Sequence, residues 1–395
     1  MKIQLQNILY YPALGGIENY IYNVSKQLVK KGHEPTILCS KHLKTLPDEE
    51  QIEGIHIKRH PYYKLPKIPF APFNPIYYAK KLQYYLKDLE MDDDVIWSRY
   101  FYETYASCEN FKGKIPIIFI QAAISPSLEK FSNSNNIITN FYLKILIEQY
   151  YLIEKKAVES CDKIITLSEV RMREIKDYYN LNENKFETVP PGVDLNLFRP
   201  KSKDLDLLKK MNIPIKSKII LSVCRLSNEK NIEMLIDAFN AIKDDNVYLV
   251  IVGDGIERNN LEMKSQRLRC KNRIIFVGFR RDTERFYSIA DVFVLPSKYE
   301  GFGQVFLEAM ASGVPCIGLK QEYPNIIVAS DEIIKNGYNG YLADPYSKED
   351  LARKIEKIIF DDKSFKLGKN ARLDCEEKYS WQRVTEKLIE ISKNI

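Results

Sequence analysis

The sequence predicts an α/β protein built from two doubly wound, Rossmann-like parallel-sheet domains that face a cleft. Short runs of continuously apolar residues, such as VYLVIV and VFVLP, alternate with segments of helical periodicity, which is typical of a parallel sheet buried on both faces. The alternation stops in the polar, proline-containing segment 186–206 and then begins again. At ~100–200 residues per domain, a chain of 395 residues is long enough for two such domains.

The first domain is expected to cover residues 1–198. Its opening β-α-β unit has a strand at 2–10, the loop YPALGG, and a helix at 17–31 whose apolar residues recur at helical spacing. The pattern predicts further strands at 34–40, near 55–60, 94–98 and 116–120, and within 161–169, and helices over 137–160 and 168–180. A C-terminal helix at about 380–395 is expected to pack back on this domain.

The second domain is expected to cover residues 199–379. Strands are predicted in KIILSVC, VYLVIVGDG, IIFVGF, DVFVLPS and VPCIGL, and helices at 232–243, 283–290 and 304–312. In open parallel sheets, ligands bind beyond the carboxyl ends of the strands. The residues that directly follow these strands are therefore the first candidates for a binding site.

Composition excludes several classes of protein. No uncharged apolar run reaches the ~18–20 residues of a membrane-spanning helix, and the N-terminus lacks the apolar core of a secretory signal. The 7 cysteines are scattered without a Cys-x-x-Cys pair, which is typical of reduced cytoplasmic thiols. All 4 histidines precede residue 61, so a histidine-based metal site is not expected. The net charge of +6 is mild, and no nucleic acid partner is expected.

The segment PSKYEGFGQVFLEAMASGVPC, residues 296–316, follows a predicted strand and opens a helix. Gly301 and Gly303 would let the backbone approach a ligand, and the helix N-terminus offers unpaired N–H groups to an anion. Glu300 and Glu308 supply carboxylates, which are good acceptors for the vicinal hydroxyls of a sugar or ribose. Either carboxylate alone would be explained by an exposed position, but the combined spacing favours a binding site.

Two further clusters follow predicted strands. Arg225 ends one strand and Lys230 begins the next helix, so the two cations could neutralise a diphosphate. An exposed ion pair between Lys230 and a neighbouring glutamate explains the pattern equally well. Gly15 and Gly16 precede the first helix, where they could contact a phosphate or only form a flexible loop. The full G-x-G-x-x-G pattern is missing, which argues against a dinucleotide.

Together these motifs resemble glycosyltransferase family 4, whose members are retaining sugar transferases of GT-B architecture. The resemblance runs along almost the whole chain, through GGIENYIYNVSKQLVKKGHE, IITLSE, VPPGVD, SVCRLSNEKN, VGDG, VGF, the segment from Glu300 to Glu308, and NGYNGYLADP. The two carboxylates combined with Arg225 and Lys230 are its most specific part.

The resemblance implies a retaining enzyme that moves a sugar from a nucleotide-diphosphate sugar to an acceptor hydroxyl, on a growing or lipid-linked glycan in cell-surface polysaccharide or glycoconjugate synthesis. It implies catalytic roles for Glu300, Arg225, Lys230 and Gln121. It implies donor contacts for Gly15, Gly16, Arg225, Lys230, Asn231, Val277, Gly278, Phe279, Glu300, Gly301, Phe302, Gly303, Gln304 and Glu308. No metal and no other cofactor is expected, because basic residues would neutralise the diphosphate.

One position departs from the family. Members often carry a histidine after the strand that reads IPIIFIQ here, where this sequence has Gln121. An amide can hydrogen-bond a sugar but cannot take a proton, so the alternative is a catalytically silent, nucleotide-sugar-binding partner subunit of the same fold. An exported solute-binding protein and an epimerase fit less well, because a signal peptide and suitable acid/base residues are not found.

Residues 61–87 combine aromatic residues, prolines and lysines. An aromatic core edge with a solvated lysine face is the simpler interpretation. The same composition fits a surface that contacts anionic lipid headgroups. The matching hypothesis is a cytoplasmic enzyme, peripheral on the inner face of a membrane, whose acceptor is lipid-linked.

Overall fold

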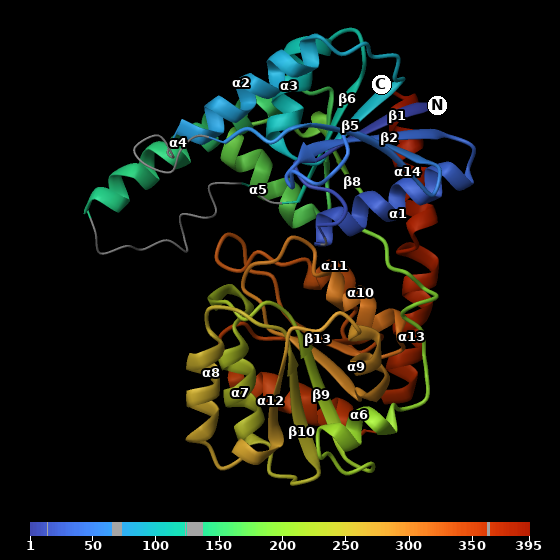
Figure 1. Ribbon diagram of the computed structural model, residues 1–395. Coiled ribbons are helices and arrows are strands. Elements are labelled where there is room, and N and C mark those ends of the chain that lie inside the picture. Colours follow the sequence, from blue (N-terminus) through green and yellow to red (C-terminus); the bar gives the residue numbers. More distant parts are fainter. Residues whose placement is uncertain (14, 65–72, 123, 125–136, 362–363) are drawn as a thin grey trace. The chain divides into compact units, whose positions relative to one another are not determined.

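The computed structural model describes residues 1–13, 15–64, 73–122, 124, 137–361 and 364–395. The chain forms two compact units, Met1–Pro190 with Val384–Ile395, and Pro191–Arg383. The sequence-based division falls at residue 198 and near residue 380. Each unit contains a sheet with helices packed against it, which confirms the predicted α/β class with two parallel-sheet domains (Figure 1).

Unit 1 contains an eight-stranded sheet in the order β3-β4-β2-β1-β5-β6-β7-β8. Its strands are β1 (Lys2–Gln6), β2 (Glu34–Lys41), β3 (Glu49–Ile52), β4 (Ile55–Pro61), β5 (Val95–Ser98), β6 (Ile117–Gln121), β7 (Lys163–Thr166) and β8 (Phe186–Thr188). All described pairings are parallel except that of β3 with β4. The chain winds outward from β1 in one direction and from β5 in the other, so the sheet is doubly wound.

Helices α1 (Gly16–Lys30), α2 (Asn74–Lys87), α3 (Phe101–Phe111), α4 (Ile137–Ser160) and α5 (Glu169–Tyr179) connect these strands. The last helix, α14 (Trp381–Lys393), begins at the end of unit 2 and continues into unit 1. There it is joined to the sheet, because the indole Nε1 of the fully buried Trp97 donates a 2.9 Å hydrogen bond to Ser392 Oγ.

The first unit differs from the sequence prediction in two places. Strand β1 ends at Gln6 instead of residue 10, because the Asn7 side chain turns the chain by donating a 2.7 Å bond to the Leu9 carbonyl. Strand β3, with sequence EEQI, was not predicted at all. It is a polar edge strand, and edge strands carry charge instead of the apolar run that marks a buried strand.

Unit 2 contains a six-stranded, wholly parallel sheet in the order β11-β10-β9-β12-β13-β14. Its strands are β9 (Lys218–Val223), β10 (Val247–Val252), β11 (Ile274–Gly278), β12 (Val292–Leu295), β13 (Cys316–Leu319) and β14 (Gly340–Ala343). Its helices are α6 (Leu205–Lys210), α7 (Ile232–Ala241), α8 (Arg258–Gln266), α9 (Thr283–Ile289), α10 (Gln304–Ala311), α11 (Ser330–Ile333), α12 (Lys348–Ile359) and α13 (Ser364–Lys378).

The strand order of unit 2 reverses between β9 and β12, which lie side by side. Such a switch point leaves a crevice at the carboxyl ends of the two strands, where ligands of doubly wound sheets bind. The segments that follow β9 and β12 contain the two strongest motifs of the sequence.

Candidate functional site

A cavity of about 530 Å³ lies within unit 2, at the carboxyl ends of its central strands. Its walls come from the residues that end or follow β9, β10 and β11 and from the first turns of α9 and α10. The lining residues are Val223, Cys224, Arg225, Val252, Gly253, Asp254, Phe279, Arg280, Arg281, Thr283, Val305 and Glu308. Three arginines and an aromatic side chain give this cavity the character of a site for an anion attached to a planar ring.

Arg225 lines the cavity with a side chain that is 73% exposed. Its Nη2 donates a 2.8 Å bond to Glu229 Oε1, and Ser227 Oγ donates to the same carboxylate oxygen. Glu229 therefore orients the guanidinium group without burying it. A charged, solvated and oriented arginine is suited to bind a phosphate.

Lys230 pairs with Glu300, and both side chains are largely buried, with exposures of 13% and 14%. The two residues meet because they follow β9 and β12, which are neighbours in the sheet. Both charges act on the Cys224 thiol in the cavity wall, whose pKa is raised to about 12, mainly by burial. The predicted exposed pair of Lys230 with a neighbouring glutamate is therefore wrong, since its partner lies 70 residues away.

Glu308 projects from α10 into the cavity wall and accepts a 2.9 Å hydrogen bond from the Tyr287 hydroxyl. Burial raises the pKa of its carboxyl to about 7, against the opposing effect of the Tyr287 hydrogen bond. Tyr287, which the sequence did not single out, is itself fully buried and fixes one carboxylate oxygen. The second oxygen of Glu308 is the better placed of the two to accept from a ligand hydroxyl.

Gly303 precedes α10 and has a φ of +90°, in the left-handed region. A Cβ at this position would lie 2.8 Å from Cδ2 of Phe306. Glycine is therefore required at this position for two reasons, its dihedral angle and the close approach of Phe306.

The other predicted residues of this segment lie next to Gly303. Phe302 is buried, and Gln304 Nε2 donates a 3.3 Å bond to the Gly192 carbonyl. Glu300 and Gly301 occupy the loop between β12 and this turn.

Of Val277, Gly278 and Phe279, which the family resemblance assigned to donor binding, only Phe279 lines the cavity, with 71% of its surface exposed. Val277 and Gly278 belong to β11 and bring Phe279 to the carboxyl edge. Asn231 begins α7 with a φ of +53°, and its Nδ2 donates to Met234 Sδ at 3.3 Å. It is not among the cavity-lining residues.

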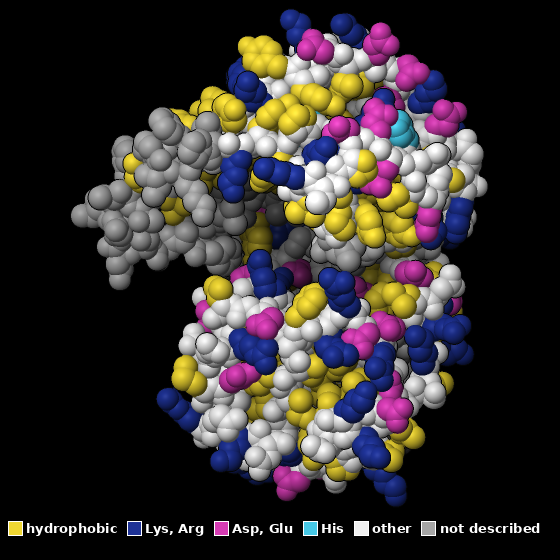
Figure 2. All heavy atoms as spheres, viewed as in Figure 1, with side chains coloured by type: hydrophobic (Ala, Val, Ile, Leu, Met, Phe, Trp, Pro, Cys, Tyr) yellow, Lys and Arg dark blue, Asp and Glu magenta, His cyan; other side chains and the backbone are white. Residues whose placement is uncertain are grey.

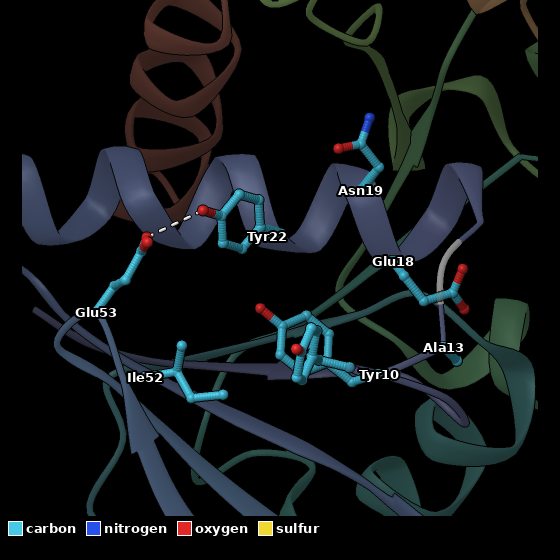
Figure 3. A pocket seen from close by; sticks show the side chains of 8 residues that line it. Tyr10, Ala13, Glu18, Asn19, Tyr22, Ile52 and Glu53 are labelled. Carbon is cyan, nitrogen blue, oxygen red and sulfur yellow. Dashed lines mark hydrogen bonds between the residues drawn. The ribbon is translucent and has the colours of Figure 1, made fainter. Parts of the chain in front are cut away.

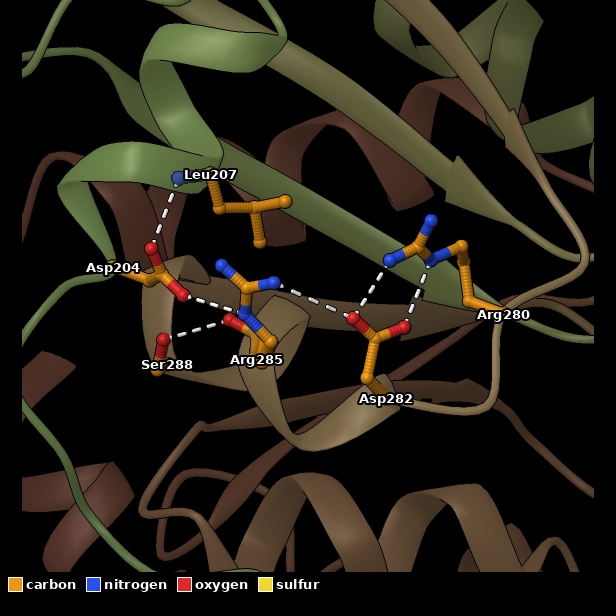
Figure 4. A network of polar contacts seen from close by, with 6 residues as sticks. All are labelled: Asp204, Leu207, Arg280, Asp282, Arg285 and Ser288. Atoms are coloured by element: carbon orange, nitrogen blue, oxygen red, sulfur yellow. Dashed lines mark hydrogen bonds and ion pairs between the residues drawn. The ribbon is translucent and has the colours of Figure 1, made fainter.

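Arg280 and Arg281 line the cavity but were missed by the sequence reasoning. The signal was available, because both directly follow Phe279 in the loop after β11. Asp282 accepts two bonds from Arg280, at 2.8 and 2.7 Å, and also pairs with Arg285 (Figure 4). Arg285 in turn donates to Asp204 at 2.7 Å, so the arginine-bearing loop is tied to the start of α6.

The remaining predicted residues belong to unit 1. Gly15 caps α1 in an extended conformation, and Gly16 is its first residue. Gln121 ends β6, is 2% exposed, and donates through Nε2 to Glu154 in α4. A buried amide that donates to a carboxylate has the features of a structural hydrogen bond.

Residues 65–72 of the aromatic, lysine-containing segment lie outside the described residues. Helix α2 covers its second part and buries Tyr78, Leu82 and Leu86 on one face. The opposite face exposes lysines together with Ile76 and Tyr84, which are 47% and 67% exposed. On the face in view, lysines and arginines of unit 2 alternate with acidic residues instead of forming one continuous basic patch (Figure 2).

Within the described part of the chain, no group of three or more His, Cys, Asp and Glu side chains is arranged to hold a metal ion. All 7 cysteines are free thiols. No described helix is both long enough and apolar enough to cross a membrane.

Comparison with known proteins gives a consistent result over both units. Residues 14–197 match the family model "Glycosyltransferase Family 4", and residues 205–374 match "Glycosyl transferases group 1". An uncharacterized glycosyltransferase of Methanocaldococcus jannaschii, MJ1607, is 28% identical, over 100% of this chain and 98% of its own length. The alpha-monoglucosyldiacylglycerol synthase of Streptococcus pneumoniae is 27% identical, over 91% of this chain and 78% of its own. Among solved structures, Anabaena Alr3699/HepE in complex with UDP and glucose is 21% identical and has a TM-score of 0.74, covering 100% of both chains.

Proposed function

Since this chain belongs to glycosyltransferase family 4 and is a glycosyltransferase of the GT-B fold, we propose that it transfers a sugar from a nucleotide-diphosphate sugar to an acceptor hydroxyl with retention of configuration. The observation that carries the proposal is the cavity of unit 2, in which Arg225, Phe279 and Glu308 converge beside the Lys230–Glu300 pair. We propose a UDP-sugar as the first donor to test, because a structural neighbour binds UDP and glucose.

Different lining residues are suited by their chemistry to bind different parts of the donor. Phe279 offers an exposed ring on which a base can stack. The ionised Glu308 carboxylate accepts from the ribose hydroxyls. Arg225, with Arg280 and Arg281 on the same cavity, supplies the positive charge that a diphosphate requires.

Lys230 and Glu300 hold each other in place until the donor binds. When the diphosphate enters, Lys230 transfers its hydrogen bonds to the phosphate oxygens, and Glu300 is released to accept from the hydroxyls of the donor sugar. Because the pair is largely buried, neither side chain has to be ordered from a solvated state. Such preorganisation favours the transition state, in which negative charge grows on the leaving diphosphate.

The breaking bond joins the anomeric carbon to the diphosphate oxygen, and the transition state resembles an oxocarbenium ion. The leaving phosphate oxygen takes the proton of the acceptor hydroxyl on the same face of the sugar, so no protein base is needed. Gln121 is then free of any proton-transfer role, in keeping with its buried hydrogen bond to Glu154. The arginines and Lys230 carry out the neutralisation that a metal ion performs in other enzymes, so we propose metal-independent transfer.

The proposed acceptor is a growing or lipid-linked glycan in cell-surface polysaccharide or glycoconjugate synthesis. Its support is the similarity to a glycolipid synthase and the exposed lysines of α2 beside Ile76 and Tyr84. We propose that the enzyme works in the cytoplasm, in peripheral contact with the anionic inner face of a membrane.

The test is a screen of UDP- and GDP-sugars with the purified protein, with and without EDTA, in which release of the nucleoside diphosphate is measured. We expect one donor to be hydrolysed slowly without an acceptor, with unchanged rate in EDTA. Arg225→Ala should lower kcat/KM by about 10²–10³-fold, as expected for loss of one oriented donor to the developing charge.

Arg353→Ala is the matched control, because Arg353 is also 73% exposed and also pairs with an acidic residue nearby in the sequence, Asp350, outside the cavity. Equal activity of the wild type and Arg225→Ala would refute the assignment. Nucleotide-sugar binding without hydrolysis or transfer of any donor would favour the silent partner subunit. Inversion at the anomeric carbon of the product would refute the proposed stereochemistry.

A further inference from the structure

Unit 1 contains a second cavity, of about 330 Å³, and no binding role was predicted from the sequence for its described lining residues. It lies along the N-terminal half of α1, between that helix, the loop after β1 and the turn that joins β3 to β4 (Figure 3). The described lining residues are Tyr10, Tyr11, Ala13, Glu18, Asn19, Tyr22, Ile52 and Glu53. Its volume is at the lower end of the ~300–1,000 Å³ of small-molecule sites, which suits a ligand of one ring.

Aromatic and apolar side chains make up one side of this cavity. Tyr10 is 4% exposed and lies across the cavity from α1, while Tyr11 is 53% exposed (Figure 3). Phenol rings present an electron-rich face. The C–H groups on one face of a pyranose ring are slightly positive and apolar, so they pack well on such a face.

The polar groups of the cavity select against an anion. Glu18 and Glu53 supply two carboxylates, and none of the described lining residues is a lysine or arginine. Two cations beside the cavity are already engaged, since Lys26 lies 3.3 Å from Glu53 Oε2 and Arg59 pairs with Glu50 and donates to the Tyr11 carbonyl. Carboxylates accept hydrogen bonds from hydroxyl groups and repel phosphates and carboxylates. The donor cavity of unit 2, with its three arginines, has the opposite character.

The turn between β3 and β4 holds Glu53 in a defined position at one end of the cavity. Ile52 pairs with Ile55, so Glu53 and Gly54 form a two-residue hairpin turn, with φ values of +50° and +79°. Asparagine or glycine is the usual residue at the first of these positions. The glutamate accepts a 3.0 Å hydrogen bond from the Tyr22 hydroxyl, which fixes both side chains at the cavity (Figure 3).

The Tyr11 end is also fixed. The guanidinium group of the buried Arg59 donates to the Tyr11 carbonyl at 3.3 Å and to the Pro47 carbonyl at 3.2 Å. The loop that carries Tyr10 and Tyr11 is therefore anchored to the strand β4. A cavity with both ends fixed in advance loses little conformational entropy when a ligand binds.

We propose that this cavity binds one neutral pyranose ring of the acceptor glycan, packed on Tyr10 and Tyr11 and hydrogen-bonded through its hydroxyls to Glu18 and Glu53. That the bound sugar belongs to the acceptor follows from the proposed function. That the cavity suits a neutral sugar ring follows from the residues of unit 1 alone.

The test measures sugar binding separately from transfer. Methyl glycosides of glucose, galactose, mannose and N-acetylglucosamine are observed by saturation-transfer difference NMR with the full chain, in excess UDP so that the donor cavity is filled. We expect one glycoside to bind the wild type, and its affinity to fall about tenfold in Tyr11→Ala and in Glu53→Gln. Tyr346→Ala, in which a tyrosine that is 66% exposed and lines neither cavity is removed instead, is expected to bind like the wild type.

The two variants change opposite ends of the cavity, so the test still works if one of them does not fold. A thermal melt of each variant shows whether it is folded. The inference is overturned if no glycoside binds the wild type, or if both folded variants bind like the wild type. It is also overturned if inorganic phosphate displaces the glycoside, or if 1-hexanol binds the cavity and no glycoside does. Donor hydrolysis in the same preparations tests the proposed function independently, since it requires no acceptor.

Discussion

Each unit buries a carboxyl group with a raised pKa, but only the one in unit 2 lines a cavity. In unit 2, Glu308 has a tyrosine partner and lines a cavity, and Arg225 is 73% exposed on the same cavity. In unit 1, Glu103 of α3 is fully buried, and within the described residues neither of its oxygens has a hydrogen-bond partner. Arg99 is 7% exposed and lies over the ring of Tyr20, 4.2 Å from its centroid.

Because of this difference, a carboxyl group of unit 2 is expected to affect ligand binding and one of unit 1 to affect stability. In unit 2, Arg225 and Glu308 are already oriented by a hydrogen-bond partner and line a cavity, so a ligand can contact them without a large change in the protein. A buried carboxyl without a counter-charge, as in unit 1, instead holds its proton, and burial raises the pKa of Glu103 to about 8. The two carboxyl groups Glu308 and Glu103 both titrate near neutrality, but only the first is expected to affect donor binding.

The largest expected effect is on the stability of unit 1. The pKa of Glu103 is higher in the folded than in the unfolded chain, so the folded state binds more protons and the unfolding free energy falls as the pH rises from about 4.5 to 8. Glu103→Gln replaces the protonated carboxyl by a neutral amide of similar shape, so its unfolding free energy does not fall with pH. The variant should therefore be more stable than the wild type by roughly 3 kcal/mol at pH 7.

The measurement is urea unfolding between pH 5 and pH 9, followed by tryptophan fluorescence; Trp97 belongs to unit 1. Glu109→Gln, on the same helix but exposed, is the control and should leave the pH dependence of the wild type unchanged. A Glu103→Gln protein that is less stable than the wild type at pH 8 would show that the carboxylate has a counter-charge after all.

A second effect concerns the turn before α10 in unit 2. Gly303→Ala adds a Cβ that lies 2.8 Å from the Phe306 ring at a φ of +90°, and should lower the unfolding free energy of unit 2 by about 2 kcal/mol. Gly337→Ala is the control, since it shares the positive φ of +80° but meets no atom nearer than 3.9 Å. It should cost about 1 kcal/mol. Equal losses in the two variants would mean that the dihedral angle alone explains the glycine.

A third effect is the pH dependence of donor binding. Because the pKa of Glu308 is raised to about 7, its carboxylate gains a proton as the pH falls from 8 to 6 and becomes a weaker acceptor for hydroxyl groups. The KM for the donor should therefore rise about tenfold over this interval. Glu308→Gln should show the higher KM at every pH, while Glu356→Gln on α12 should follow the wild-type profile. A pH-independent KM in the wild type would count against the ribose contact.

The effect that is smallest per replaced side chain is on membrane contact. Replacing Lys80, Lys81 and Lys87 of α2 by glutamine should weaken sedimentation with phosphatidylserine vesicles at low salt, by about 1 kcal/mol per lysine. Glutamine at the exposed lysines 209, 210 and 216 of unit 2 provides a control of equal charge change. If both triple variants sediment alike, the surface of α2 has no special role.

The candidate site shows how far sequence reasoning reaches. Arg225 and Glu308 were predicted from the motifs that follow two strands, and Phe279 from the family resemblance, and the structure brings these three to one cavity. The Lys230–Glu300 pair was not predicted, because it depends on β9 and β12 being neighbours across 70 residues of chain. Arg280 and Arg281 were missed although they directly follow Phe279 in the loop after β11.

By itself, the sequence determined the fold class, most of the element bounds and the motifs from which residues of the unit 2 cavity come. These follow from local periodicity and from glycines at strand ends, both of which can be read from neighbouring residues. Tertiary structure decided the properties that depend on what lies near a residue in space. The raised pKa of Glu308 needs burial beside Tyr287, and the cavity of unit 1 needs Tyr10, Tyr22 and Glu53 to meet from three separate elements. Burial and strand order are set by the packing of the whole sheet, so they cannot be predicted from a short stretch of sequence.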